Sequence, residues 1–332
     1  MCAPDTRQTT IRDVAKRAGV SVGTVSRALR GQTGLTEQRR QQILTVAQQV
    51  GYDLNRLRPG RFRRVLFLLH RQHATLQANP FYAPVLHGVE ELCRSRGLAL
   101  SYSSVGPGDG VGDLARLHEA DGLLCVGFFE PEWLGELRQI SRRLVLIDHF
   151  HEDFPSVNSD NLGGAKAAVL HLIHRGRRRI AFVSGPPQHY SIAQRRQGYL
   201  DALEQAGLPA LPEYQVVRNP PEDELATPAA VQRLLALPNP PDAIFAYNDA
   251  TAMIAMKVCQ ELGLSVPGDI AVAGFDDLAA AAQTSPSLTS VAVDKEALGR
   301  EGMRLLLRQP HPGSGPIHKV IPVSLILRES SG

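Results

Sequence analysis

Several polar side chains follow directly after short apolar runs, in positions where they could bind a polar ligand. Asp148 follows the run Leu144–Ile147, and Asn248 and Asp249 follow Ile244–Tyr247. Further polar residues near such runs are His189, Ser191, Arg195, Asp276 and Asp277. Carboxylates accept hydrogen bonds, arginine donates them and amides do both, so the set suits a hydroxyl-rich ligand. A single residue of this kind is more often a helix cap, as we expect for Asp249, whereas several at one crevice favour ligand binding.

The same side chains could in principle serve an enzyme, with Asp148 and Asp276 as an acid–base pair. No glycine-rich dinucleotide motif follows the apolar run Val65–Leu69, and neither a P-loop nor a G-x-S-x-G turn is present. The four cysteines have no metal-ligand spacing: Cys2, Cys93, Cys125 and Cys259. We therefore predict no catalytic residue, no cofactor and no metal, with a sugar-converting α/β enzyme as a disfavoured alternative.

A second chemically informative set lies near the N-terminus, on an expected short helix from Val22 to about Leu29. Its outward positions hold small polar groups and one arginine: Val22, Gly23, Thr24, Ser26 and Arg27. Such groups suit nucleic-acid edges and phosphates better than a protein core, and arginine can bind guanine through two hydrogen bonds. This helix is therefore a candidate for reading DNA.

The charge distribution separates the N-terminus from the rest of the 332-residue chain. Residues 1–64 hold 13 Lys/Arg and 4 Asp/Glu, a net charge of 13 − 4 = +9. The remainder holds 36 − 13 = 23 basic and 33 − 4 = 29 acidic residues, a net charge of −6. A basic head on an acidic body predicts a polyanion-binding module joined to a second domain.

Three short helices are expected in the head. Thr10 with Asp13 resembles an N-cap, Gly19 ends the first helix, Ser21 caps the second, and Thr36 precedes the third. The apolar positions of these helices are Ile11, Val14, Ala15, Ala18, Val25, Ala28, Leu29, Ile43, Leu44, Val46, Ala47 and Val50. Two helices joined by a glycine turn and braced by a third predict a helix-turn-helix. A generic three-helix bundle would not explain the outward polar groups or the charge.

The body alternates between strands and helices, which predicts an α/β fold with doubly wound parallel sheets in two lobes. Expected strands after Val65–Leu69 are 98–103, 122–126, 143–147, 179–183, 214–217, 242–246 and 270–274. Expected helices are 82–96, 161–175, 191–206, 226–237, 249–262 and 294–308. Because parallel sheets bind ligands at the carboxyl ends of their strands, the polar residues described above are well placed.

The run from Thr10 to Leu29, TIRDVAKRAGVSVGTVSRAL, resembles the DNA-binding signature of the lac repressor (LacI/GalR) family. The resemblance implies base contacts from Val22, Gly23 and Arg27, although Gly23 has no side chain to read a base. It implies that Ser21, Thr24 and Ser26 contact phosphates or support the turn. The predicted DNA-binding set also contains Thr10, Tyr52, Asn55, Leu57, Arg58 and Arg61.

The segment after Tyr52 departs from the family pattern. Relatives continue into a short hinge helix whose leucine enters the minor groove, whereas this chain has Pro59, Gly60 and then Arg61 in that region. Proline and glycine disfavour a helix there. We favour a basic arm that contacts phosphates or a narrow minor groove. The alternatives are a displaced wedge from Leu57 or Phe62 and an ordinary linker.

Motifs in the body extend the resemblance to the family's effector domain, which is similar to periplasmic sugar-binding proteins. They are Asn79–Tyr82, Val157–Gly164, Arg195–Tyr199, Asn248–Asp249 and Gly274–Asp277. The resemblance implies effector contacts from Asp148, Arg195, Asn248 and Asp276, and adds Phe81, Tyr82, His189 and Ser191 to the candidate site. His189 stands where purine-sensing relatives use arginine. A sugar or sugar phosphate is therefore the preferred effector, with a nucleobase as the alternative.

Three regions are expected along the chain. Residues 1–53 form the helix-turn-helix domain, 54–64 a basic linker and 65–332 the effector-binding and dimerisation domain. Its first lobe spans about 65–160 plus 291–321, and its second about 161–290 plus 322–329.

The expected protein is a cytoplasmic homodimer that binds a palindromic operator as a transcriptional repressor under effector control. A plain solute-binding protein would not need the basic head. The sequence has no apolar run of the ~18–20 residues that a membrane helix needs. Effector binding could release the operator or promote its binding.

Overall fold

The computed structural model describes residues 10–30, 35–50, 62–70, 80–106, 108–141, 143–217, 226–308 and 315–332. The chain divides into two compact units, Met1–Phe62 and Arg63–Gly332, which we describe separately. No helix within the described ranges is long and apolar enough to cross a membrane.

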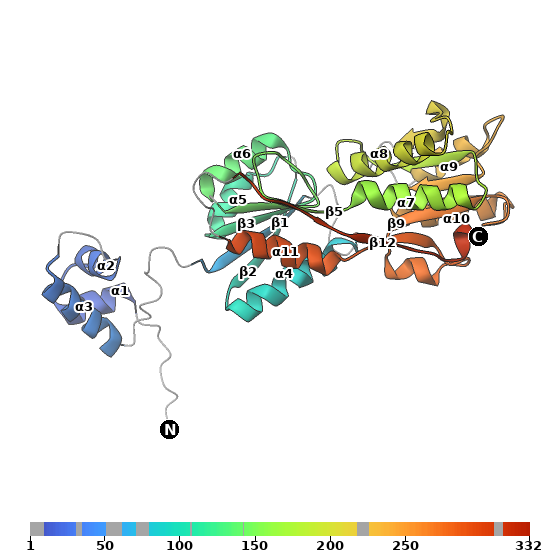
Figure 1. Ribbon diagram of the computed structural model, residues 1–332. Coiled ribbons are helices and arrows are strands. Elements are labelled where there is room, and N and C mark those ends of the chain that lie inside the picture. The colour runs from blue at the N-terminus through green and yellow to red at the C-terminus, as the bar shows by residue number, and fades with distance from the viewer. Residues whose placement is uncertain are drawn as a thin grey trace, which may run out of the picture. The chain divides into compact units, whose positions relative to one another are not determined.

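The head contains three helices around one small apolar core (Figure 1). They are α1 (Ile11–Ala18), α2 (Val22–Arg30) and α3 (Glu37–Gln49). The buried residues are Val14, Ala15, Val25, Ala28, Leu29, Ile43 and Ala47, and the other predicted apolar positions pack partly buried against them. The arrangement confirms the predicted helix-turn-helix.

Local hydrogen bonds explain where the head helices begin and end. Gly19 ends α1 at φ 62°, a left-handed conformation that glycine adopts without a steric penalty. Ser21 Oγ accepts a hydrogen bond from the backbone N of Thr24 at 3.1 Å, as an N-cap does. At α1 the side-chain roles differ from expectation, because Thr10 Oγ1 donates to the Asp13 carboxylate at 2.7 Å. The Thr10 backbone N also donates to that carboxylate, so Asp13 closes the first turn.

Two six-stranded sheets form the body (Figure 1). The first has the strand order β11-β5-β4-β3-β1-β2, and the second has the order β12-β10-β9-β8-β6-β7. The strands of the first sheet are β1 (Arg64–His70), β2 (Ala99–Val105), β3 (Gly122–Val126), β4 (Leu144–Ile147), β5 (Ser156–Ser159) and β11 (His318–Ile321). Those of the second are β6 (Ile180–Ser184), β7 (Gln215–Val217), β8 (Ala243–Ala246), β9 (Ala271–Asp276), β10 (Thr289–Val293) and β12 (Val323–Ile326). Neighbours pair in parallel except β10 with β12, which confirms the predicted parallel α/β fold.

Helices cover both faces of each sheet (Figure 1). In the first lobe they are α4 (Tyr82–Arg96), α5 (Val111–Leu117), α6 (Pro131–Ile140) and α11 (Lys295–Leu307). In the second they are α7 (Asn161–His174), α8 (Tyr190–Gln205), α9 (Ala226–Leu235) and α10 (Asp249–Glu261). Because both faces are covered, strands such as β3, β4, β6 and β8 are buried along their whole length.

The chain passes between the lobes three times, and one of these passages differs from expectation. The predicted first lobe resumed at residue 291, but β10 continues to Val293 within the second sheet, where it pairs with β9 and β12. The passage therefore comes at Asp294, just before α11. Elements α5, α6, β5, β10 and β11 were also absent from the predicted strands and helices.

Glycines in two of the recognised motifs serve helix packing. A Cβ at Gly198 on α8 would lie 2.3 Å from the backbone O of Leu162 on α7. A Cβ at Gly164 on α7 would lie 2.8–3.0 Å from side chains of β9, β10 and β12. These positions thus require glycine because α7 lies tight against α8 on one side and the second sheet on the other.

The last residues of the chain anchor the strands of the second lobe. Ser330 is 0% exposed, and its Oγ donates to the backbone O of Val272 at 2.6 Å and accepts from the backbone N of Thr289 at 2.9 Å. Val272 and Thr289 lie near the starts of β9 and β10, so the tail joins these neighbouring strands at their N-terminal ends.

We expect Ser330→Ala to lower the free energy of unfolding by about 2 kcal/mol, because it leaves a buried carbonyl and a buried N–H without their partner. Chemical unfolding followed by tryptophan fluorescence and circular dichroism measures the change. Ser324→Ala, at an exposed position on β12, is the matched control and should stay within about 0.5 kcal/mol. Equal effects of the two substitutions would contradict this role.

Candidate functional site

Two of the predicted carboxylates lie at strand ends in unusual backbone conformations. Asp148 follows β4 with φ 56°, and Asp276 ends β9 with φ 109°, followed by Asp277 with φ 48°. Non-glycine residues rarely adopt positive φ, and each such position costs about 1–3 kcal/mol. Strain of this kind concentrates at binding sites, where surrounding contacts hold it, and the contacts around Asp276 are extensive.

Arg195 joins the strand ends of the second lobe to one another. From α8, its Nε donates to Asn161 Oδ1 at 2.8 Å and its Nη1 to the backbone O of Tyr247 at 2.6 Å. Its Nη2 lies 3.1 Å from Asp276 Oδ1, and both side chains are more than nine-tenths buried. The guanidinium also stacks 3.8 Å from the ring centroid of Phe275. Arg195 is therefore held rigidly, with Asp276 as its counter-ion.

Tyr82 and Asp148 form the facing part of the site on the first lobe. The Tyr82 hydroxyl donates to Asp148 Oδ2 at 2.9 Å, and both residues are buried. The second oxygen, Asp148 Oδ1, is buried and has no hydrogen-bond partner of normal geometry among the described residues, although the Ser191 hydroxyl is close enough to lower the pKa of Asp148. An unpaired buried carboxylate oxygen is costly, so this atom is a natural acceptor for a ligand hydroxyl.

The two lobes are coupled electrostatically through these groups. Burial raises the pKa of Asp148, against the opposing effects of Arg195, Tyr82 and Ser191. Burial also raises the pKa of Asp276 to about 6, while Arg195 and Lys295 lower it and Asp148 raises it. Burial raises the pKa of Tyr82 well above its usual value, with a further increase from Asp148. Residues of both lobes thus meet at one buried polar site between the lobes, which is called the cleft below.

Asn248 caps α10, although the sequence predicted that Asp249 would be the cap. Asn248 is the N-cap of α10, because its Oδ1 accepts from the backbone N of Thr251 at 2.9 Å. Asp249 was expected to be the cap, but it lies in the first turn and is fully buried. The capping bond uses only Oδ1 of Asn248, which leaves the Nδ2 donors available to a ligand.

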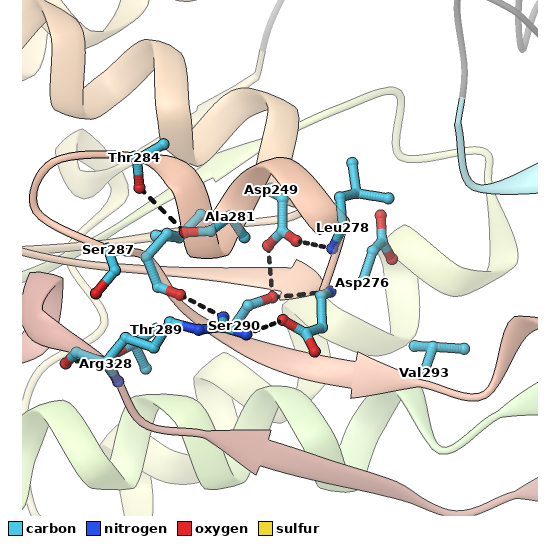
Figure 2. Close-up of polar contacts among 12 residues, drawn as sticks. Asp249, Asp276, Leu278, Ala281, Thr284, Ser287, Thr289, Ser290, Val293 and Arg328 are labelled. Atoms are coloured by element: carbon cyan, nitrogen blue, oxygen red, sulfur yellow. Dashed lines mark hydrogen bonds and ion pairs between the residues drawn. The ribbon is translucent and has the colours of Figure 1, made fainter.

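A hydrogen-bond network around Asp249 holds the strained Asp276–Asp277 turn (Figure 2). The Asp249 carboxylate accepts from the backbone N of Leu278 at 2.7 Å and from Ser290 Oγ at 2.5 Å. Ser290 Oγ in turn accepts from the backbone N of Asp277 at 3.0 Å. We conclude that Asp249 is a positioning residue beneath the cleft.

Cationic side chains hold the same turn from two other elements. Arg328 pairs with the Asp277 carboxylate at 2.7 Å, which directs the Asp277 side chain toward the tail. Lys295, at the start of α11, donates to the backbone carbonyls of Asp276 and Asp277. The turn is therefore tied to α11 of the other lobe as well as to its own.

The raised pKa of Asp249 predicts that the free energy of unfolding depends on pH. Burial, and next the charge of Asp276, raise the pKa of Asp249 from its ordinary value of 3.8 to about 7. The stabilisation from its protonated form is complete below about pH 3.8 and disappears as the pH rises through about 7. Asp249→Asn, which is neutral at every pH, lacks this dependence. We expect the stability of the wild type relative to the variant to fall between pH 4 and 7, measured by unfolding both proteins across that range. Parallel pH profiles would contradict the assignment, since other titrating groups are common to both proteins.

Aromatic and imidazole rings line the neighbouring part of the cleft. His189, the residue before α8, packs its ring 5.3 Å from the ring of Phe128, which follows β3 in the other lobe. The ring of His149 lies 5.5 Å from the same Phe128 ring. Burial lowers the pKa of both histidines to about 4, so both are neutral at physiological pH. This part of the site is built from flat, uncharged rings.

The structure therefore brings most of the predicted effector residues together. Tyr82, Asp148, Ser191, Arg195 and Asp276 form one coupled group. Phe81 packs edge-on against Tyr82, with ring centroids 5.0 Å apart, and lies 6.0 Å from Lys295 Nζ. Sequence reasoning missed Asn161, Lys295, Phe128 and His149. Phe128 and His149 carried a usable signal, because each follows shortly after a predicted strand.

The recognition helix α2 presents several of its predicted DNA-binding residues outward. Val22 is 42% exposed, Arg27 is exposed, and a Cβ at Gly23 would meet only Ser21 Oγ, at 3.8 Å. Thr24 and Ser26 are half-buried, and Thr24 Oγ1 lies 2.8 Å from Ser21 Oγ, so these residues support the turn as well as face outward. Predictions for Tyr52, Asn55, Leu57, Arg58 and Arg61, and for Pro59 and Gly60, lie outside the described residues.

A helix-turn-helix head and a two-lobed domain with a polar cleft define a class of protein, the ligand-responsive DNA-binding regulators. Residues 10–55 match the family model "Bacterial regulatory proteins, lacI family", and residues 169–331 match the model "Periplasmic binding protein-like domain". The chain is 31% identical to the transcriptional repressor CytR of Escherichia coli K12, covering 97% of this chain and 96% of the relative. It is 32% identical to the regulator CelR of Thermobifida fusca, with 98% of both chains covered. The chain belongs to the LacI family and is a DNA-binding transcriptional regulator.

Solved structures agree with this assignment. A complex of the regulator CelR with cellobiose matches with a TM-score of 0.73 and 30% identity, over 97% of this chain and all of that chain. The lac repressor dimer bound to its operator matches with the same TM-score at 22% identity, over 98% of this chain and 99% of that chain, which supports the fold.

Proposed function

We propose that this protein is a transcriptional repressor whose affinity for a palindromic operator is controlled by a sugar or sugar phosphate. The observation that carries the effector assignment is the coupled group of Asp148 and Arg195–Asp276 across the cleft. Carboxylates and a fixed guanidinium match the donors and acceptors of sugar hydroxyls. The similarity to CelR, whose structure was solved with cellobiose, supports the same class of ligand.

The proposed DNA-binding unit is a cytoplasmic homodimer. A single head of this size contacts few base pairs, and two heads related by a two-fold axis match a palindromic site. Effector that closes the cleft would change the relative placement of the two heads. A coupling free energy of about 1–3 kcal/mol would change operator affinity about 5–150-fold.

The experiment begins with selection of operator sequences from random DNA by the purified full-length chain. Affinity for the selected DNA is then measured with and without candidate sugars across a range of salt concentrations. We expect a palindromic consensus, a steep salt dependence and a change in affinity with one sugar class. Selection of no consensus, or turnover of the added sugar, would refute the proposal.

A nucleobase effector remains the second candidate. The specific observation in its favour is the flat wall of Phe128, His149 and His189, on which a planar ring could stack. The same affinity measurement, made with nucleosides and bases in place of sugars, separates the two classes.

A further inference from the structure

We infer that the effector of this protein is a neutral, unphosphorylated molecule that donates hydroxyl hydrogen bonds to Asp148 and Asp276. This inference rests on the proposed function, because it concerns the ligand of the same cleft. It separates the two ligand classes, sugar and sugar phosphate, that the residue types by themselves leave together.

The first argument is the balance of charge in the cleft. Asp148 and Asp276 are 7% and 5% exposed, and Asp148 is among the groups that raise the pKa of Asp276. Among the described residues, the cationic side chains that act on these two carboxyls are Arg195 and Lys295. A phosphate ester would add ~1.5–2 negative charges at pH 7 to a site that already holds two carboxyls.

The second argument is that protein groups already balance the charge of one cation and occupy the donors of the other. Arg195 uses Nε, Nη1 and Nη2 on Asn161, Tyr247 and Asp276, and its face lies on Phe275. Lys295 donates to the backbone carbonyls of Asp276, Asp277 and Val293, so its donors point to the turn. To bind a phosphate, Lys295 would have to give up contacts that hold Asp276 in place. The N–H groups that Arg195 has left belong to a guanidinium whose charge Asp276 already balances, so they suit a neutral hydroxyl better than a phosphate.

The third argument is the nature of the groups left unsatisfied. Asp148 Oδ1 is buried without a hydrogen-bond partner of normal geometry among the described residues, and it can only accept while ionised. Ligand hydroxyls supply the donor that it lacks, whereas phosphate oxygens supply further acceptors. The neighbouring histidines, His149 and His189, are uncharged and packed against Phe128. This wall therefore adds flat surface to the site and no positive charge.

The test compares matched pairs of ligands on the full-length chain. Cellobiose, glucose, ribose and cytidine are each assayed beside their monophosphates by thermal shift and calorimetry. In parallel, a small-molecule extract of bacterial cells is separated by anion exchange into neutral and anionic fractions, and each fraction is assayed in the same way. We expect stabilisation by a neutral compound or by the neutral fraction, and binding at least about 100-fold weaker for the phosphate of that compound.

A charge variant makes the test independent of folding effects. Asp148→Asn should weaken binding of the neutral ligand. It should nevertheless raise the ratio of the affinity for the phosphate ester to the affinity for its neutral parent, because one repelling charge is gone. Asp153→Asn, at an exposed carboxylate a few residues further on, is the control and should leave the ratio unchanged. A loss of packing would lower both affinities together and could not raise this ratio.

Three results would overturn the inference: a phosphate ester that binds as tightly as its parent, activity confined to the anionic fraction, or no stabilisation by any neutral compound or fraction. Operator binding without ligand is measured in the same preparations. Its loss would count against the proposed function, whereas intact operator binding with a phosphorylated effector would refute this inference alone.

Discussion

Replacing Asp276 with asparagine should remove the response to effector while leaving operator binding without effector intact. The carboxylate is buried, pairs with Arg195 and ends β9 at the cleft. A hydrogen bond from a ligand hydroxyl to a charged acceptor contributes about 1.5–3 kcal/mol, so effector affinity should fall about 10–150-fold. The substitution also leaves the buried Arg195 charge without its counter-ion, which weakens the orientation of that donor. Effector titration of an operator complex, followed by fluorescence anisotropy, measures the change.

Asp277→Asn is the matched control for this experiment. It makes the same chemical change one residue later, where the carboxylate pairs with Arg328 instead of facing the cleft. We expect a modest loss of stability and an unchanged effector affinity. If Asp277→Asn impairs the response as much as Asp276→Asn does, disruption of the turn explains the loss, and the prediction that Asp276 contacts the effector directly is wrong.

Arg27→Ala should reduce affinity for the selected operator much more than affinity for random DNA. Arg27 is exposed on α2, and an arginine bound to guanine through two hydrogen bonds contributes about 1–3 kcal/mol of discrimination, or about 5–150-fold. If Arg27 contacted only a phosphate, its loss would weaken binding to both kinds of DNA equally. It would also reduce the slope of log affinity against log salt concentration by about 1. Competition binding at two salt concentrations separates these cases.

The control for Arg27 is another arginine of the head. Arg39, on α3, hydrogen-bonds to Gln42 and to the helix start and has no place on the recognition helix. Arg39→Ala removes the same charge, so it should change the two affinities by similar factors. A specificity loss equal to that of Arg27→Ala would show that net charge, and not base contact, explains the effect.

Local sequence signals predicted the head well. Gly19 and Ser21 each act through backbone groups within five residues, so their effect on helix ends does not depend on distant segments. The apolar spacing of Val14, Val25 and Ile43 likewise indicates which face of each helix is buried. For the same reason the long apolar strands of the body were recognised, because strands covered on both faces are apolar throughout.

Short polar strands escaped prediction for a physical reason. The strands β5 and β11 carry Ser156, Asn158 and His318, which have no apolar pattern. They are strands because they pair with one another and β5 pairs with β4, and these partners are up to about 160 residues apart in the chain. Pairing energy between remote segments leaves little trace in either segment alone.

At the candidate effector site, too, some features follow from the sequence and others from the tertiary structure. The amino-acid sequence determined which polar side chains follow the strands, and therefore that Asp148, Arg195, Asn248 and Asp276 could share an edge. The tertiary structure decided their partners: Tyr82 for Asp148, Asp276 for Arg195, and Ser290 with Leu278 for Asp249. It also decided that Asp276 balances the charge of Arg195 and that backbone carbonyls take the donors of Lys295, because these contacts join segments far apart in the chain. Residue types determine what a side chain can bind, whereas the fold determines which of its bonds remain free for a ligand.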